Sequence, residues 1–453
     1  MFVNREKELD TLKREYSKDA AAFSVIFGRR RMGKTTLISR YIQNKRALYY
    51  YATEVRGRQH IEQLTLQIMR FLNKPHLHDL QFSDMEQLLI FFSEQLPQEQ
   101  KIIFAIDEYQ EIVKVIPEFS SILQKVWDLH FKSKNIHLIL CGSVISMMHS
   151  ETLAYDAPLY GRRTSNIHLK PMKFINIKDF IPSISLEDAI RIYASFGTVP
   201  KYLELYDEHL DFMENIQQSI LNKDAYLYQE VKYLLKEEKG DGPTYFSIIQ
   251  TIAMGEKKIG NIAKRLQMPS NHLTRYLMKL IDLDIIEKEV PITEKNPLKS
   301  KLGRYRIIDR FIDFWFFYVY KNTSLLEIGQ YRYVLDEIEK TFNQRFVSFA
   351  FEDYVKELIM ENPMQYLGFV PLKMGRWWSK NAEIDLVAIG EDSIALIECK
   401  WQNQPVDIHT YQEMIQKSQY IEHSTPLTFI LFSKNGFHSS LKDIPNLRTY
   451  SYL

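Results

Sequence analysis

The chain has 453 residues, of which 45% are hydrophobic and 25% are charged, a composition typical of globular proteins and not of disordered or fibrous ones. Its 58 Lys and Arg residues nearly balance its 57 Asp and Glu residues, giving a formal net charge of +1. This balance excludes a global field that attracts a polyanion, so any nucleic-acid surface has to be a local patch. The length predicts about three domains.

The cysteines and apolar runs indicate the compartment. Cys141 and Cys399 lie far apart in apolar runs, where buried free thiols are commoner than a disulfide, so we expect a reducing, cytoplasmic environment. Because Met1 leads within a few residues into the charged run NREKELD, no signal peptide is expected. The longest apolar run, residues 311–320, is about half a membrane span and contains Asp313, which predicts a buried helix.

A charged helix is predicted from Phe2 to Tyr16, with Asn4 as its N-cap. The segment after it, SVIFGRRRMGKTT, contains the phosphate-loop pattern G-x-x-x-x-G-K-[ST] between β-forming residues and an amphipathic run. Glycines at both ends allow successive N–H groups to point at a phosphate, although a glycine-punctuated turn is the alternative. The residues expected to bind ATP are Gly28, Arg29, Arg30, Arg31, Met32, Gly33, Lys34, Thr35 and Thr36.

Two loop residues have specific expected roles, and a pair of acids complements them. Lys34 would reach the β- and γ-phosphates, and the hydroxyl of Thr35 would hold Mg²⁺. The apolar run at residues 102–106 predicts a strand buried on both faces, which ends in Asp107 and Glu108. Strands often end in solvated carboxylates, but after a phosphate loop this pair resembles a Walker B strand. Asp107 would hold Mg²⁺, and Glu108 would activate the attacking water.

Three further residues are candidates in the ATPase reaction. The next predicted strand, residues 137–141, is followed by Ser143, which either senses the γ-phosphate or belongs to a simple turn. Arg162 and Arg163 follow in the run LYGRRT. One of them would act as an arginine finger on a neighbouring subunit or domain, as in a homo-oligomer, or both are ordinary surface arginines. The other elements expected in this region are a strand at residues 47–52 and helices at residues 59–72 and 85–96.

The runs FVNRE, GRRRMGKTT, FAIDE, LILCGS, LYGRRT and FGTVPKYL, in this order, resemble the archaeal-type ATPase family, P-loop NTPases related to the AAA+ and STAND groups. The resemblance covers residues 1–206 and implies an α/β fold with a parallel sheet and a helical lid. Members of this family carry a winged helix and a nuclease-like domain behind the ATPase. The expected domains are the ATPase core at 1–175, the lid at 176–240, the winged helix-turn-helix at 241–320 and the nuclease-like domain at 321–453.

The middle of the chain changes to short helices, predicted at residues 244–255, 259–268 and 270–286. Two strand-like runs, IIEKEVPI and GRYRII, would form the wing, so that the order resembles a winged helix-turn-helix domain. Residues at the start of the third helix would meet base edges in the major groove, and basic wing residues would contact phosphates. Winged helices also serve as protein-docking modules. The expected DNA contacts are Asn271, His272, Thr274 and Arg275 on the helix and Lys299, Lys301, Arg304 and Arg306 on the wing.

Two apolar strands near the C-terminus contain charged residues. In the strand at residues 383–389, Asp385 lies on the face opposite the apolar side chains. In the strand at residues 393–401, Glu398 and Lys400 share one face. Charged residues in such apolar strands are costly unless they are paired or bind a metal. A tight turn between the strands would bring these residues together.

The spacing of Asp385, twelve intervening residues and then Glu-Cys-Lys resembles the PD-(D/E)XK nuclease signature, although Ile384 stands where that family has Pro. The resemblance implies a divalent ion, Mg²⁺ or Mn²⁺, on two carboxylates, a lysine that orients or helps deprotonate water, and an acid on the preceding helix, here residues 341–360. A helix at 407–420 and a strand at 427–432 would complete the αβββαβ order. The residues matching these roles are Asp385 and Glu398 for the metal, with Lys400 and Glu352 as further catalytic residues.

Arg376, Trp377 and Trp378 lie just upstream, and they either grip a nucleic acid or pack in the core. Taken together, the motifs predict an ATP-hydrolysing, DNA-directed protein with a metal-dependent endonuclease-like domain, for example in genome defence or mobile-element processing. The alternative is a STAND-like, nucleotide-controlled switch that binds DNA or a protein partner and cuts nothing. An intact nuclease signature favours the first interpretation.

Overall fold

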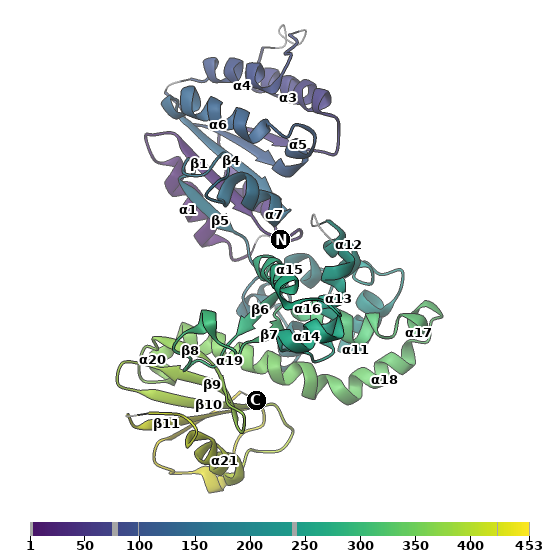
Figure 1. Cartoon of the computed structure of the whole chain (residues 1–453), viewed down its shortest axis with the longest axis vertical. Coiled ribbons are helices and arrows are strands. Elements are labelled where there is room, and N and C mark those ends of the chain that lie inside the picture. The colour runs from purple at the N-terminus through teal and green to yellow at the C-terminus, as the bar shows by residue number, and fades with distance from the viewer. Residues whose placement is uncertain (1–2, 75–79, 98, 238–241, 424, 453) are drawn as a thin grey trace. The chain divides into compact units, whose positions relative to one another are not determined.

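The computed structural model describes residues 3–74, 80–97, 99–237, 242–423 and 425–452. The chain divides into two compact units, shown in Figure 1. The first contains residues 1–172, 199–201 and 236–240, and the second contains residues 173–198, 202–235 and 241–453. The domain boundary expected between residues 240 and 241 lies outside the described residues.

The first unit is built on a five-stranded sheet in which every neighbouring pair of strands is parallel. The strands lie in the order β2-β3-β4-β1-β5. Every residue of β1, β3 and β4 is buried, as predicted for strands covered on both faces. The bounds are β1 Ala22–Phe27, β2 Ala47–Tyr51, β3 Ile102–Asp107, β4 Ile136–Gly142 and β5 Ser165–His168.

Helices cover both faces of this sheet, with α3, α4 and α6 on one side and α1 on the other (Figure 1). The bounds are α1 Glu6–Tyr16, α2 Lys34–Ile42, α3 Gly57–Phe71, α4 Met85–Glu94, α5 Tyr109–Val115, α6 Phe119–Leu129 and α7 Ile145–Met148. The predicted N-cap Asn4 is wrong, because α1 begins after Arg5, and Asn4 has a φ of +43°. Phe2, where this helix was expected to begin, lies outside the described residues.

The second unit begins with a helical region. Its elements are α8 Ile177–Phe180, α9 Leu186–Phe196, α11 Phe212–Ile216, α16 Arg310–Phe314, α17 Thr323–Glu327 and α18 Tyr331–Phe342. Two helices, α10 Pro200–Leu203 and α12 Glu230–Glu237, each span a change of unit. The apolar run at residues 311–320 forms α16 and the π-helical segment Trp315–Tyr320, and it is largely buried, as predicted. Among the described residues, no helix combines the length and apolar character needed to cross a membrane.

Three helices and a two-stranded sheet follow one another in the middle of the chain, in the order expected from the sequence. The helices are α13 Gly242–Ala253, α14 Ile259–Arg265 and α15 Ser270–Asp282, and the antiparallel strands are β6 Ile286–Glu289 and β7 Arg304–Ile307. Helix α15 buries Leu273, Leu277 and Leu280 on one side. Its opposite side is therefore free to present polar side chains.

The C-terminal part is a mixed five-stranded sheet in the order β12-β11-β10-β9-β8. Strands β8, β9 and β10 are antiparallel neighbours, whereas β10, β11 and β12 are parallel. Cys399 of β10, like Cys141 of β4, is buried and free. The bounds are α19 Ser348–Glu361, α20 Pro363–Tyr366, β8 Lys373–Trp378, β9 Glu383–Ile389, β10 Ile394–Lys400, α21 Ile408–Ser418, β11 Leu427–Ser433 and β12 Leu447–Ser451.

Candidate nucleotide site and C-terminal carboxylate centre

The phosphate loop joins the end of β1 to the start of α2, and both of its glycines have backbone conformations that disfavour a side chain. The φ angle is +151° at Gly28 and +84° at Gly33. A Cβ atom on Gly28 would lie 2.4 Å from the carbonyl oxygen of Leu169. Helix α2 begins at Lys34, directly after the second glycine. The loop thus ends at the positive pole of a helix, where phosphate is favoured.

The side chain of Lys34 is folded into this loop. It is 5% exposed, and its Nζ donates to the carbonyl oxygens of Gly28 at 2.9 Å and Arg29 at 3.1 Å. The ammonium group is therefore already held at the place where the motif requires it to meet phosphate oxygens. Of the other loop residues, Arg29 and Met32 are buried, Arg31 is half-buried, and Arg30 and Thr36 are exposed.

Thr35 and Asp107 lie together although they are 72 positions apart. Thr35 Oγ1 donates to Asp107 Oδ2 at 2.7 Å, and Tyr49 OH donates to the same oxygen at 2.8 Å. The other oxygen, Oδ1, accepts from the backbone N–H of Glu108 at 3.0 Å. Since Asp107 is fully buried, these three donors compensate a carboxylate that would otherwise be costly. Tyr49 was missed by the sequence analysis.

Glu108 and Ser143 are also brought together, as the C-terminal ends of parallel strands should be. Ser143 Oγ donates to Glu108 Oε2 at 2.7 Å. The amide of Gln110, a fully buried residue, donates to the same carboxylate and to Ser143 Oγ at 3.1 Å. Glu108 itself has a left-handed backbone, with φ +53°, and such sparsely populated conformations cluster at functional sites. Gln110 directs this carboxylate and was not predicted.

A third residue that the sequence analysis missed, Arg5, holds the loop from behind. Its guanidinium donates to the carbonyl oxygens of Met32 at 3.2 Å and Lys170 at 2.8 Å. Burial lowers the pKa of Arg5, and the nearby Glu8 opposes that shift. A buried guanidinium is tolerated here because it donates hydrogen bonds to two backbone carbonyls. The FVNRE run therefore contains a structural support of the phosphate loop.

The two arginines of LYGRRT differ in their surroundings. Arg162 forms an ion pair with Asp128 at 3.0 Å and donates to the carbonyl of Tyr160 at 3.0 Å. Arg163 lies over the ring of Tyr160, 5.5 Å from its centroid. Arg162 is therefore anchored within its own chain. Within the described residues, Arg163 makes a ring contact and no ion pair.

In the C-terminal sheet, β9 and β10 bring Asp385 close to Glu398. Asp385 Oδ2 accepts from the backbone N–H of Cys399 at 2.9 Å. Glu398 is 2% exposed, and its two oxygens accept from Lys400 at 3.1 Å and from Lys417 at 2.6 Å. Burial and the charge of Glu398 raise the pKa of Asp385. Burial opposes ionisation of Glu398 too, but the two lysines outweigh it and lower its pKa. Lys417 was not predicted.

Glu352 does not join these two acids. Its carboxylate forms an ion pair with Arg376 of β8. Within the described residues, no group of three or more His, Cys, Asp and Glu side chains is arranged to hold a metal ion. The centre thus contains two neighbouring carboxylates, those of Asp385 and Glu398. These are the two residues that the sequence analysis proposed as metal ligands.

The expected DNA contacts fall into two groups. On α15, Asn271, His272 and Arg275 are exposed and Thr274 is half-buried, and on the wing Lys299 and Lys301 are exposed. The other two wing arginines point inward. Arg304 pairs with Glu383 at 3.2 Å and stacks 4.4 Å from the ring of Trp378. Arg306 pairs with Glu287 at 2.6 Å. It was expected to contact DNA phosphates, but in the structure its guanidinium is engaged in this ion pair.

Trp377 and Trp378 are each 4% exposed. Trp377 belongs to the core of the C-terminal sheet, where Ile384 and Leu396 are neighbours in the same cluster, and its indole donates to Thr293 Oγ1 at 3.1 Å. The sequence left open whether these two tryptophans grip a nucleic acid or pack in the core. In the structure both are packed in the core.

A parallel sheet with a phosphate loop, and Asp107 beside Thr35, define the first unit as a P-loop NTPase. A model of an ATPase domain predominantly from Archaea matches residues 2–206, and a model of archaeal and bacterial proteins of unknown function matches residues 315–414. The uncharacterized protein MJECL04 of Methanocaldococcus jannaschii is 36% identical over 426 residues, 93% of this chain and 92% of that protein. The chain therefore belongs to the same family as MJECL04, and its residues 2–206 match the archaeal ATPase domain.

Other similarities are shorter or structural. The uncharacterized ATP-binding protein MJ0423 of the same archaeon is 46% identical over 46 residues, 10% of this chain and 78% of that protein. The Walker-type ATPase PABY2304 of Pyrococcus abyssi has 18% identity and a TM-score of 0.48, covering 70% of this chain and 96% of its own. The ORC2 protein of Aeropyrum pernix, solved in ADPNP and ADP complexes, has 12% identity and a TM-score of 0.45, covering 73% and 96%.

Proposed function

We propose that the first unit binds ATP with Mg²⁺ and hydrolyses it. The observation that carries this proposal is the 2.7 Å contact between Thr35 and Asp107 beside a phosphate loop. The loop from Gly28 to Thr36 would bind the phosphates through its N–H groups, and Lys34 would bond the β- and γ-phosphates. Membership in an archaeal ATPase family supports the same activity.

The residues present fit both ligands. Hydroxyl and carboxylate oxygens, such as those of Thr35 and Asp107, are the hard donors that Mg²⁺ prefers, and Mg²⁺ sites commonly combine one or two carboxylates with substrate phosphates. When bound, Mg²⁺ neutralises charge that develops on the phosphates. The lining of the loop is equally suitable for ATP, because the glycine at each end leaves room for the backbone to approach phosphate oxygens.

In hydrolysis, water attacks the γ-phosphorus and the bond from that phosphorus to the bridging oxygen breaks, giving ADP and phosphate. Glu108 would orient the water and accept its proton, while Gln110 and Ser143 hold the carboxylate in position. An arginine finger would stabilise charge on the phosphate from a neighbouring subunit. Arg163 suits this role better than Arg162, whose guanidinium is already paired with Asp128.

The experiment is phosphate release from ATP by the full chain, with Mg²⁺ and with EDTA. Lys34→Ala should abolish ATP binding measured by calorimetry, and with it hydrolysis. Lys132→Ala is the matched control, because Lys132 is exposed and remote from the loop in sequence. Equal ATP affinity in the two variants would remove Lys34 from the site and the proposal with it.

A second candidate function is cleavage of DNA at the C-terminal centre, which the adjacent buried carboxylates of β9 and β10 favour. Asp385 and Glu398 would hold a divalent cation, Mg²⁺ or Mn²⁺, which when bound stabilises charge on a scissile phosphate. Lys400 would orient a water or the phosphate. Glu352 could take part in the reaction only after its ion pair with Arg376 breaks. The match to proteins of unknown function over this region is compatible with the assignment.

Cleavage is tested on supercoiled plasmid with Mn²⁺ or Mg²⁺. Asp385→Asn should abolish nicking and lower the affinity for Mn²⁺, whereas Asp392→Asn, in the exposed turn between β9 and β10, should behave as wild type. Cutting by Asp385→Asn at the wild-type rate would mean that the nuclease is a contaminant or lies elsewhere. If the wild-type protein cuts no nucleic acid, the alternative of a nucleotide-controlled switch without nuclease activity would replace this proposal.

DNA binding would use the exposed side of α15 and the tip of the wing. Asn271, His272, Thr274 and Arg275 would lie in the major groove, with Lys301 on phosphates. Changing Lys301 to Ala should weaken binding to all sequences and lower the slope of its salt dependence by about one unit. Together these parts describe an ATP-controlled, DNA-directed protein suited to genome defence or mobile-element processing.

A further inference from the structure

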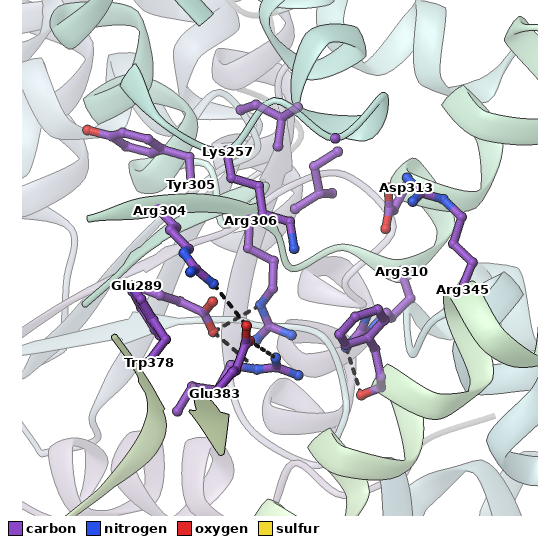
Figure 2. A pocket seen from close by; sticks show the side chains of 15 residues that line it. Lys257, Glu289, Arg304, Tyr305, Arg306, Arg310, Asp313, Arg345, Trp378 and Glu383 are labelled. Carbon is purple, nitrogen blue, oxygen red and sulfur yellow. Dashed lines mark hydrogen bonds and ion pairs between the residues drawn. The ribbon is translucent and has the colours of Figure 1, made fainter. Parts of the chain in front are cut away.

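A small basic cavity lies within the second unit, between the wing strands and the C-terminal sheet. Its volume is about 70 Å³, enough for a small anionic group and too little for a whole nucleotide. Its walls come from the loop after α13, from β6 and β7, from α16, from the segment at residues 345–349, and from β8 and β9. Figure 2 shows the side chains converging on it. The charged residues that line it are Lys257, Glu289, Arg304, Arg306, Arg310, Asp313, Arg345, Arg376 and Glu383.

The lining carries more positive than negative charge, with six basic residues against three acidic ones. Some of the arginines are compensated from outside the cavity, since Asp353 pairs with Arg306 at 3.2 Å and with Arg310. Burial raises the pKa of Asp313, which weakens one of the three acids as a negative charge. Arg376 also forms an ion pair with Glu352, which does not line the cavity. These acids offset part of the positive charge and hold the arginines in place.

Lys257 differs from the arginines because its amine has no such partner. Within the described part of the chain, Lys257 Nζ makes no hydrogen bond and no ion pair within 4.0 Å, and it lies 5.7 Å from the ring of Phe349. Figure 2 shows Lys257 among the side chains that line the cavity. Burial and the charge of Arg376 lower the pKa of Lys257. The charges of Glu383 and Glu289 oppose this shift in part. Lys257 is an exposed residue, so an anion can reach its ammonium group from solvent and would relieve its repulsion by Arg376.

We propose that this cavity is a phosphate-binding site, in which the ammonium of Lys257 and the guanidinium groups of Arg304 and Arg376 bind the oxygens of one phosphate group. Guanidinium forks approaching from different directions match the tetrahedral oxygens of phosphate, whereas a planar carboxylate would engage fewer of them. Glu383, which pairs with both arginines at 3.2 and 3.5 Å, would give way to the phosphate. The site requires neither ATP hydrolysis nor cleavage, so it goes beyond the proposed function.

Two sources of phosphate fit this chemistry, the backbone of a nucleic-acid strand and a free phosphate compound. The geometry favours the strand, because Glu383 begins β9 and Asp385 follows two residues later in the same strand. A phosphodiester seated in the cavity would place the neighbouring part of the strand along the sheet that carries the carboxylate centre. The 70 Å³ volume agrees with a single phosphate whose sugars and bases stay outside.

The first arm of the test measures binding of a fluorescein-labelled 20-nucleotide strand to the full chain by anisotropy, in EDTA to prevent cleavage. Lys257→Gln should raise the dissociation constant about tenfold, as expected for one charge-assisted hydrogen bond, and should lower the slope of log affinity against log salt by about 0.7. Lys258→Gln is the matched control, because Lys258 is exposed like Lys257 but does not line the cavity, and it should leave the dissociation constant and the salt slope unchanged. Lys257→Arg keeps the charge and should bind as wild type.

The second arm measures inorganic phosphate and tripolyphosphate by calorimetry in a Lys34→Ala background, which prevents the phosphate loop from contributing. If these anions lose affinity in Lys257→Gln while the oligonucleotide does not, the ligand is a free phosphate compound. If the oligonucleotide loses affinity, the ligand is a nucleic-acid backbone. The proposal is overturned if Lys257→Gln and Lys258→Gln bind both probes equally, or if Lys257→Arg loses as much affinity as Lys257→Gln.

Discussion

The hydroxyl of Thr35, at the start of α2, donates a 2.7 Å hydrogen bond to the carboxylate of Asp107, at the end of β3. Strands β1 and β3 are not neighbours, because β4 lies between them. The contact therefore depends on the parallel order of the sheet, which brings the carboxyl ends of all these strands to one edge. It brings together the two oxygen groups that the sequence placed in separate motifs and that we propose as ligands of Mg²⁺.

Removing the hydroxyl of this pair should separate nucleotide binding from catalysis. Thr35→Ala leaves the loop N–H groups and Lys34 in place, so ATP should still bind in EDTA, but Mg²⁺-dependent phosphate release should fall by more than about tenfold. Thr35→Ser keeps the hydroxyl and should retain most of the activity. If Thr35→Ala hydrolyses ATP as fast as Thr35→Ser does, the pair is a structural contact and not part of a metal site.

Gln110 should behave as a positioning residue, because it contacts Glu108 and Ser143 rather than the expected position of ATP. Gln110→Leu has a similar volume and removes only the amide donors. We expect kcat to fall about tenfold to hundredfold, since a misplaced catalytic group is costly, while the Kd for ATP changes little. A variant that weakens ATP binding and leaves kcat unchanged would show that Gln110 acts on the nucleotide and not on Glu108.

Arg5 should stabilise the phosphate loop, because its guanidinium donates directly to the loop carbonyl of Met32. Arg5→Met would leave the carbonyls of Met32 and Lys170 without this donor, at a cost of about 1–3 kcal/mol. We expect a lower Tm for the first unit and a weaker ATP affinity. Arg14→Met is the control, because Arg14 is exposed in helix α1, which begins directly after Arg5. Indistinguishable Tm and Kd values for the two variants would contradict the role given to Arg5.

The sequence predicted those parts of the nucleotide site that depend on local pattern. Lys34 and Thr35 follow a glycine in a motif, and Asp107 and Glu108 end an apolar run, so their positions follow from short stretches of chain. The roles of Arg5, Tyr49 and Gln110 were not predicted, because their contacts join segments that are distant in the sequence. Asn4 failed as an N-cap because its left-handed backbone places the helix start after Arg5.

The C-terminal region shows the same distinction. Strand alternation alone placed Asp385 near Glu398 across the β9–β10 hairpin, because register follows from a short turn. The partners Lys417 and Arg376 come from α21 and β8, and no periodicity indicates which charges these elements direct inward. Arg304 and Arg306 have the alternation of exposed wing residues, but acids on β6, β9 and α19 draw them into the cavity.

Stability of the first unit should fall as the pH is lowered below neutrality, because His137 is buried in its neutral form. Its ring nitrogens contact Ser24 Oγ at 2.7 Å and Tyr41 OH at 2.8 Å, and burial lowers its pKa to about 3. Since the unfolded chain protonates His137 near pH 6.5, stability is complete above that value and declines toward pH 3 by up to about 1.4 kcal/mol per pH unit.

The pH dependence of this local stability can be measured by hydrogen exchange of the full chain at pH 5 and pH 7. Protection is compared in peptides from β1 and β4 after correction for intrinsic exchange rates. In His137→Gln the pH dependence of protection should be smaller than in wild type, whereas His409→Gln, an exposed histidine of the second unit, should leave it unchanged. An identical pH dependence in wild type and His137→Gln would assign the acid lability to other groups.

The most direct test of ATP hydrolysis in the first unit is a comparison of wild type with Glu108→Gln, in which the side chain keeps its size and loses its charge. Binding of ATP with Mg²⁺ is measured by calorimetry and turnover by phosphate release, on the same preparations. The account predicts an ATP affinity within a few fold of wild type and turnover reduced by about 10²- to 10⁴-fold. Turnover by Glu108→Gln equal to that of wild type would contradict it.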